Sequence, residues 1–96
     1  MKPVNHIRNS KEKFLEVKVF STPVIGKEFF EGKVKTVSSK NRLGDFDILP
    51  GHTNFITIIL ESLTIHTFSP EKKINYQFGR GILEVSKDKV NVFLGL

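Results

Sequence analysis

The stretch Phe55-Ile56-Thr57-Ile58-Ile59-Leu60 (FITIIL) decides the fold class of this chain. Nearly all of its side chains are apolar, and most are β-branched or aromatic, which favours extended backbone. Successive side chains of a strand point to opposite faces of a sheet, so this stretch presents apolar groups to both faces. We therefore expect it to form a central strand that is covered on both sides.

The segments on either side of this stretch alternate apolar and polar residues with a period of two, which is typical of half-buried strands. This alternation runs through residues 14–20, 34–37, 63–67, 76–85 and 90–94. Turn signals separate these runs: Thr22-Pro23, Glu31-Gly32, Asn41 to Gly44, Pro50-Gly51, Ser69-Pro70, Gly79 to Gly81 and Lys87-Asp88. Short strands at such intervals, with no helical stripe, predict an all-β sandwich or barrel.

Length and composition restrict the classes of protein that the chain can belong to. Its 96 residues suffice for one domain, and the absence of cysteine excludes disulfides and thiolate ligands. No apolar run approaches the roughly 20 residues that a membrane-spanning helix needs. Residues 1–13 read as a flexible basic arm, and residues 14–96 as the folded domain. The formal net charge is +5, but the lysines are spread along the chain rather than clustered.

Candidate catalytic and metal-binding groups do not form a recognised motif. His6, His52 and His66 have neither the spacing nor the cysteine partners of a zinc site. Asp45 and Asp47 are two residues apart in an extended segment, so their carboxylates lean the same way. Paired carboxylates can act as acid and base, but paired surface aspartates near a turn are far commoner. We expect no catalytic residue, no cofactor and no metal.

A basic nucleic-acid-binding module remains the alternative. Nine phenylalanines interleaved with lysines could form a stacking platform for single strands. In an all-β domain without tryptophan, however, such phenylalanines more often build the core. Composition and periodicity therefore lead only to an all-β binding module.

The segment LGDFDILPGHTNFIT, from Leu43 to Thr57, resembles the signature of the ε subunit of F-type ATP synthases, which is called δ in mitochondria. Three further segments resemble the family in the same order: VFSTP at Val19 to Pro23, FFEGKVKTV at Phe29 to Val37, and GRGILEVSKDKVNVFLGL at Gly79 to Leu96. The resemblance implies an antiparallel β-sandwich of about ten short strands. It also implies a non-catalytic rotor subunit that binds the γ subunit and the c-ring.

The resemblance assigns expected roles to individual residues. Asp45 matches an acidic position that faces the c-ring, and Asp47, which replaces the usual glycine, is expected beside it. Ser21, His52 and Thr57 match positions at the γ contact. The apolar residues expected to anchor that contact are Phe46, Ile48 and Phe55. Gly44, Pro50 and Gly51 are expected to shape the turns, and Pro50-Gly51 suits a type II turn.

The resemblance also sets expectations about regulation and location. The sequence ends at Leu96, directly after the last expected strand, so we expect a subunit that couples rotation without the family's inhibitory C-terminal helices. Glu61-Ser62 stands where the family usually has Pro-Gly, so this hairpin is expected to turn differently. The expected location is the cytoplasmic face of a bacterial inner membrane, or the matrix or stromal face of an organelle, within a hetero-oligomeric complex and without membrane insertion.

Overall fold

A computed structural model of the chain describes residues 13–21, 30–69 and 72–95. Most of the expected basic arm, His6 and the Thr22-Pro23 turn lie outside the described residues. None of the described residues forms a helix that could cross a membrane.

The described residues form one seven-stranded sheet in the order β2-β1-β7-β6-β5-β3-β4. The strands are β1 (Leu15–Ser21), β2 (Phe30–Val34), β3 (Thr36–Asn41), β4 (Gly44–Ile48), β5 (Phe55–His66), β6 (Lys73–Ser86) and β7 (Lys89–Leu94). All neighbours pair antiparallel except β1 and β7, which run parallel. The all-β prediction is confirmed, although the described strands are fewer and two of them longer than expected.

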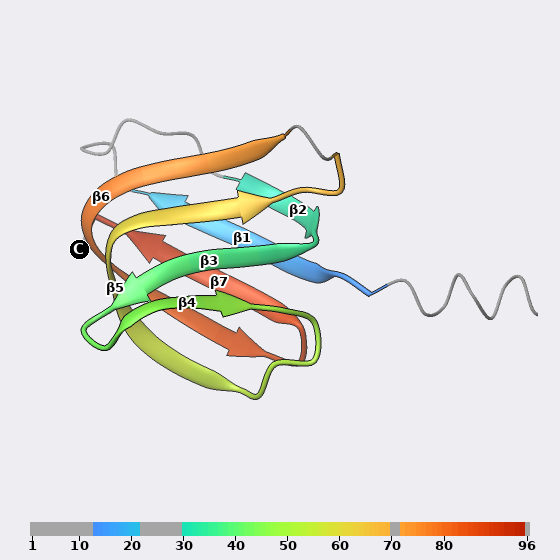
Figure 1. Ribbon diagram of the computed structural model, residues 1–96, viewed down its shortest axis with the longest axis horizontal. Coiled ribbons are helices and arrows are strands. Elements are labelled where there is room, and N and C mark those ends of the chain that lie inside the picture. The colour runs from blue at the N-terminus through green and yellow to red at the C-terminus, as the bar shows by residue number, and fades with distance from the viewer. Residues whose placement is uncertain (1–12, 22–29, 70–71, 96) are drawn as a thin grey trace, which may run out of the picture.

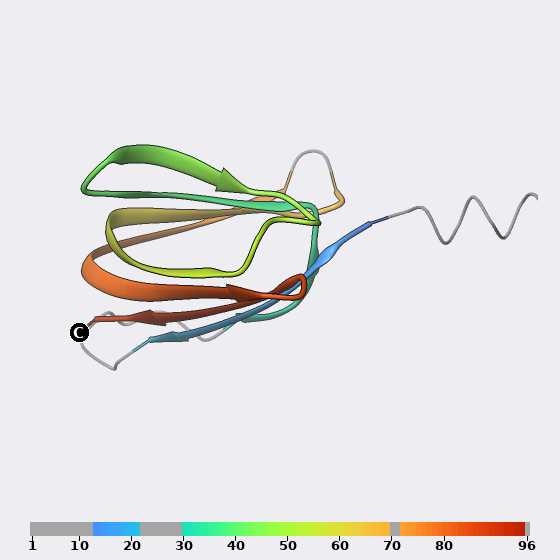
Figure 2. The same cartoon turned by 90° about the horizontal axis from the view of Figure 1, so that it is seen from below.

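This single sheet folds over on itself into two layers, which Figure 1 shows face on and Figure 2 shows edge on. The β3–β4 layer contains β3, β4, the second half of β5 and the first half of β6. The β1–β7 layer contains β1, β2, β7, the first half of β5 and the second half of β6. β5 and β6 are long enough, at 12 and 14 residues, to pass from one layer into the other. The layers therefore share two continuous strands.

A β-bulge opposite Glu61 interrupts the pairing of β5 with β6 at the point where both strands pass from one layer into the other. The register with β6 shifts between Leu60 and Ser62, and Glu61 has a positive φ of 75°. Leu60 pairs with Arg80 and Ser62 with Gln77, so the extra residue lies in β6, where Phe78 and Gly79 face Glu61 alone. Such an insertion bends the strands and leaves a backbone group without a ladder partner. Ser39, which is nearly buried on β3, donates its hydroxyl to the carbonyl oxygen of Ser62 at 2.7 Å. The expected hairpin at Glu61-Ser62 is thus replaced by a bend within one strand.

Gly81 allows β6 and β7 to approach each other closely. A Cβ at this position would lie 2.6 Å from the carbonyl oxygen of Phe93 and 3.1 Å from Cδ2 of Leu94, so only glycine allows this approach of β7. The turn predicted at Gly79 to Gly81 is therefore wrong, because both glycines lie inside β6. Sequence patterns read glycine as a chain reversal, but here it permits close backbone packing.

The core lies between the two layers. Its members are aliphatic, apart from Tyr76, and nearly all are inaccessible to solvent: Leu15, Val17, Val19, Val34, Val37, Ile48, Ile59, Leu63, Ile65, Tyr76, Leu83, Val85, Val90, Val92 and Leu94. They occupy alternate positions of β1 and β7, as the period of two predicts. Four of the phenylalanines that sequence analysis placed in the core, Phe30, Phe46, Phe55 and Phe78, pack against its edge.

We predict that Gly81→Ala destabilises the domain by about 1–3 kcal/mol, because overpacking forces the neighbouring backbone to shift. Gly79→Ala is the matched control, since a Cβ at Gly79 would meet no atom within 4 Å. Urea denaturation followed by circular dichroism measures both free energies of unfolding. Equal stability of the two variants would show that the approach at Gly81 is not tight.

Candidate functional site

The Pro50-Gly51 pair forms the centre of a tight turn that fixes the loop before β5. The backbone N–H of His52 donates to the carbonyl oxygen of Leu49 at 3.0 Å, and Gly51 has a φ of 91°, as a type II turn requires. The N–H of Gly51 also donates to Oδ1 of Asp88 at 2.6 Å. The loop is thereby attached to the turn between β6 and β7, and His52 has a defined position.

His52 belongs to an aromatic cluster with Phe55 and Phe46. The rings of His52 and Phe55 are 4.9 Å apart between centroids, and Phe55 meets the edge of Phe46 at 5.9 Å. Phe46 is on β4 and Phe55 on β5, so the cluster joins the two layers. Ile48, expected as a partner contact, is fully buried in the core. Its alternation with the exposed Asp47 places it on the inner face, so we remove it from the partner-facing residues.

The structure does not bring the remaining expected contact residues together. Ser21 ends β1 and pairs with Leu94 of β7. Thr57 lies on β5, where its hydroxyl oxygen accepts a hydrogen bond from Nδ2 of Asn41 at 3.1 Å. β7 and β6 lie between β1 and β5 in the sheet, so Ser21 and Thr57 belong to different parts of the surface.

Asp45 and Asp47 both lie on the exposed face of β4. They follow a hairpin in which Oδ1 of Asn41 accepts the N–H of Leu43 at 2.9 Å and Gly44 has a φ of 126°. Positive φ at Gly44 is a conformation that other residues adopt rarely. The hairpin thus presents both carboxylates at the outer surface of the β3–β4 layer.

Asp47 is held by a short polar chain. The hydroxyl of Ser38 donates to Oδ1 of Asp47 at 2.6 Å, and Oγ of Ser38 is 3.1 Å from Nε2 of His66. A hydroxyl has one proton, so if it goes to Asp47, Nε2 of His66 must be the donor to Ser38. His66 then has no lone pair directed at Ser38. This arrangement orients Asp47 and does not activate Ser38 as a nucleophile.

Asp45 stands in a different electrostatic setting. Lys40 lies directly opposite it on β3, yet the Lys40 ammonium bonds to Oε1 of Glu61 at 2.8 Å. This hydrogen bond and the charge of Glu61 raise the pKa of Lys40, and Asp45 adds to the rise. The same contact lowers the pKa of Glu61. Among the described residues, Asp45 forms no ion pair within 4.0 Å.

The outer face of the β1–β7 layer carries a row of apolar side chains. Strand register places Ile58 beside Ile82, Ile82 beside Phe93, and Phe93 beside Phe20. Phe20 and Phe93 stack at 5.1 Å with nearly parallel rings. We call these four residues the apolar row, and Ile56 adjoins it on β5 with 67% of its surface exposed. Soluble monomers rarely expose contiguous apolar groups without a binding role.

Sequence reasoning missed the apolar row, although the signal was present. FITIIL is apolar on both faces, and this was interpreted as a strand covered on both sides. The structure covers only the side of Ile59, and leaves Ile58 50% exposed on the other. The second apolar face of this stretch therefore marks a surface and not a core.

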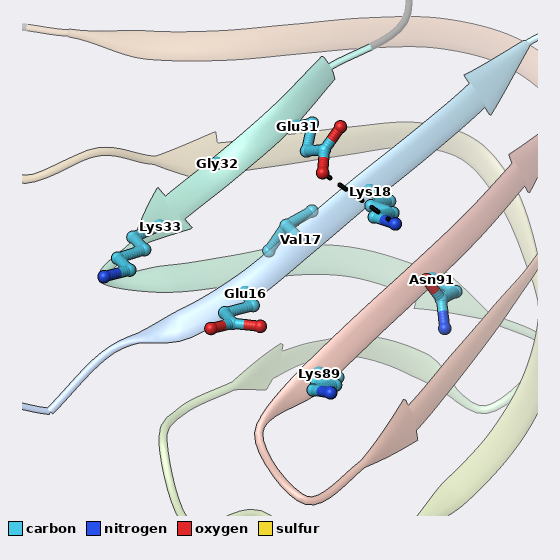
Figure 3. Close-up of a pocket in the computed structure, with 8 residues that line it drawn as sticks. All are labelled: Glu16, Val17, Lys18, Glu31, Gly32, Lys33, Lys89 and Asn91. Carbon is cyan, nitrogen blue, oxygen red and sulfur yellow. Dashed lines mark ion pairs between the residues drawn. The ribbon is translucent and has the colours of Figure 1, made fainter.

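A charged depression of about 450 Å³ occupies the other end of this face (Figure 3). Its polar lining alternates in sign across β2, β1 and β7: Lys33, Glu31, Lys18, Glu16, Lys89 and Asn91. Lys18 and Glu31 form an ion pair at 3.8 Å, which Figure 3 marks. Alternating charges give neither the cationic groove of a nucleic-acid-binding surface nor a concentrated anion site. The described residues also contain no group of three or more acidic, histidine or cysteine side chains that could hold a metal.

These features define a β-sandwich module with an apolar face and an acidic hairpin as its distinctive surfaces. A family model described as "ATP synthase, Delta/Epsilon chain, beta-sandwich domain" matches residues 16–94. The chain belongs to this family, and the resemblance seen in the sequence is confirmed.

Individual relatives agree with the family. An ATP synthase epsilon chain from Clostridium botulinum is 27% identical over 67 residues, which is 70% of this chain and 50% of that protein. The chain thus spans half the length of this curated relative. A chain of the Euglena gracilis mitochondrial ATP synthase superposes with a TM-score of 0.74 at 16% identity, covering 86% of this chain and 51% of its own length. A chain of the Tetrahymena thermophila central stalk and c-ring structure gives 0.67 at 13% identity, covering 88% and 64%.

We predict that Lys40→Met raises the pKa of Glu61 toward its ordinary value, because the hydrogen bond and charge that lower it are lost. In the wild-type chain the pair favours the folded state above the ordinary glutamate pKa, and this contribution disappears as pH falls through the lowered pKa. Carboxyl NMR titration measures the shift. Lys73→Met removes an equal charge from another exposed lysine and should leave Glu61 unchanged. An unchanged titration in Lys40→Met would contradict the contact.

Proposed function

We propose that this chain is a non-catalytic central-stalk subunit of an F-type ATP synthase, which couples the γ subunit to the c-ring during ATP synthesis. The exposed apolar row carries the proposal, together with the family match over residues 16–94. Such a subunit needs adhesive surfaces and a stiff body, and it needs no cofactor.

The apolar row is the proposed docking surface for γ. Stable interfaces centre on apolar and aromatic residues that become fully desolvated. The family implies γ contacts at Ser21 and Thr57 as well, but each alternates along its strand with members of the row, so we propose them as contacts separate from the row. His52, with Phe55 and Phe46, stays in the proposal as a separate part of the γ contact.

The acidic hairpin is the proposed docking surface for the c-ring. Asp45 is exposed and forms no ion pair among the described residues, so its carboxylate is available for charge-assisted hydrogen bonds to a cation of the ring. Asp47 already accepts a hydrogen bond from Ser38, so we propose that it contributes less than Asp45 to binding of the c-ring. The hairpin lies in the β3–β4 layer and the apolar row in the β1–β7 layer, which allows both partners to bind at once.

The architecture suits the transmission of torque between two such partners. β5 and β6 are continuous through both layers, and close-packed cores transmit strain because they resist compression. The proposed location is peripheral, on the cytoplasmic face of a bacterial inner membrane or on the matrix or stromal face of an organelle.

We predict that Ile58→Asp weakens binding to the γ subunit by at least about tenfold, since interface anchors typically contribute 2 kcal/mol or more. Ile58 is half exposed, so the variant should keep its fold, which circular dichroism verifies. Gln77→Asp adds the same charge to the polar outer face of the β3–β4 layer and serves as the control. Titration calorimetry against purified γ measures both. Equal affinity of the two variants would remove the apolar row from the γ interface.

For the c-ring contact we expect Asp45→Asn to cost about 2 kcal/mol of binding, the lower end for loss of one partner of a charge pair. Asp47→Asn should cost less, because its amide oxygen can still accept the hydroxyl of Ser38. Binding to purified c-ring at several salt concentrations is the measurement, with proton-driven ATP synthesis as the functional assay. Wild-type coupling in the double variant would contradict the proposed ring contact.

A further inference from the structure

Lys40 is the closest cross-strand neighbour of Asp45, yet the two do not form an ion pair. Directly opposite residues of antiparallel strands lie close enough to interact, and opposite charges there attract. The Lys40 ammonium is instead 2.8 Å from Oε1 of Glu61. The Lys40 ammonium therefore has two acidic neighbours, Asp45 and Glu61, and it pairs with Glu61.

Glu61 lies opposite the β-bulge of β6, at the point where β5 passes from one layer into the other. Its φ of 75° is uncommon for a residue other than glycine and costs free energy. The backbone beside the bulge is held by a hydrogen bond from the hydroxyl of Ser39 on β3 to the carbonyl oxygen of Ser62. Backbone strain of this kind is retained where the surrounding structure requires it, and it is frequent at functional sites. Here the strained backbone of Glu61 places the Glu61 carboxylate beside Lys40, which then does not pair with Asp45.

We propose that Glu61 is a positioning residue, which holds the Lys40 ammonium away from Asp45 and so keeps the Asp45 carboxylate free for a cationic group on the partner surface. This inference rests on the proposed function, because it takes Asp45 as the ring-facing contact. It extends that function by naming a residue that acts through Lys40 and not through the partner.

The physical reason is that Lys40 and a cationic group of the partner compete for the carboxylate of Asp45. Asp45 lies directly opposite Lys40 on the neighbouring strand, so without the charge of Glu61 the internal pair forms at the expense of the external one. Both side chains of the present pair are solvent-exposed, at 38% for Lys40 and 69% for Glu61. Exposed pairs contribute little, so the expected change in partner affinity is about two- to fivefold.

The test is a double-mutant cycle with full-length chain and purified c-ring. Glu61→Gln should weaken binding by about two- to fivefold in the wild-type background. In the Lys40→Met background the same substitution should have no effect, because the competing ammonium is gone. Equal weakening in both backgrounds would mean that Glu61 contacts the partner itself, and no weakening in either would mean that Lys40 does not compete. Both results overturn the proposal.

Two controls separate this inference from the function on which it rests. Glu31→Gln breaks the other exposed ion pair, Lys18–Glu31, in the opposite layer and should not change binding. Asp45→Asn alone tests the ring contact: if it has no effect, the proposed contact fails, whereas an effect of Asp45→Asn without one of Glu61→Gln overturns only the inference. In the isolated chain, the side-chain NMR signals of Lys40 should respond more strongly to Asp45→Asn when Glu61 is glutamine. An equal response would also overturn it.

Discussion

The close approach of β6 and β7 at Gly81 is the contact on which the rest of this structure depends. Residues 13–21, 30–69 and 72–95 contain one hydrogen-bonded sheet and no helix, so this sheet buries one of its faces by folding over on itself. That requires sharp bends in two adjacent strands. Gly81 allows the backbone of β6 to approach the carbonyl oxygen of Phe93, and the bulge of β6 opposite Glu61 lies where both strands change layers. The aliphatic core fills the space between the layers.

Folding a sheet in this way creates two outer faces, and their chemistry differs. The β3–β4 layer presents polar groups to solvent, and they are paired across the strands: Ser38 donates to Asp47, and Asn75 donates to Thr64. The β1–β7 layer shows the apolar row at one end and alternating charges at the other. Exposing the apolar row to water does not stabilise an isolated subunit, and such patches typically mark binding surfaces. The asymmetry is therefore the physical basis for the proposal that one layer binds γ and the hairpin of the other meets the c-ring.

The layer change of β5 also affects the β3–β4 hairpin, which is the proposed docking surface for the c-ring. Glu61 has a positive φ at the point where β5 changes layers, and it is also the ion-pair partner of Lys40. A family member with Pro-Gly here would turn without a carboxylate at this point. The departure from the family pattern, which the sequence showed only as a difference in turn chemistry, has an electrostatic consequence for Asp45.

Local rules determined a large part of this protein from its sequence. The alternation in β1 and β7 identified buried positions, because a strand has a strict period of two. Pro50-Gly51 identified a turn, because each residue presets one backbone angle. The signature from Leu43 to Thr57 identified the family. Tertiary structure alone decided the layer changes, the exposure of Ile56 and Ile58, the burial of Ile48, and the hydrogen bond between Ser38 and Asp47. These depend on which strands become neighbours, and contacts between residues far apart in the chain leave no periodic trace along it.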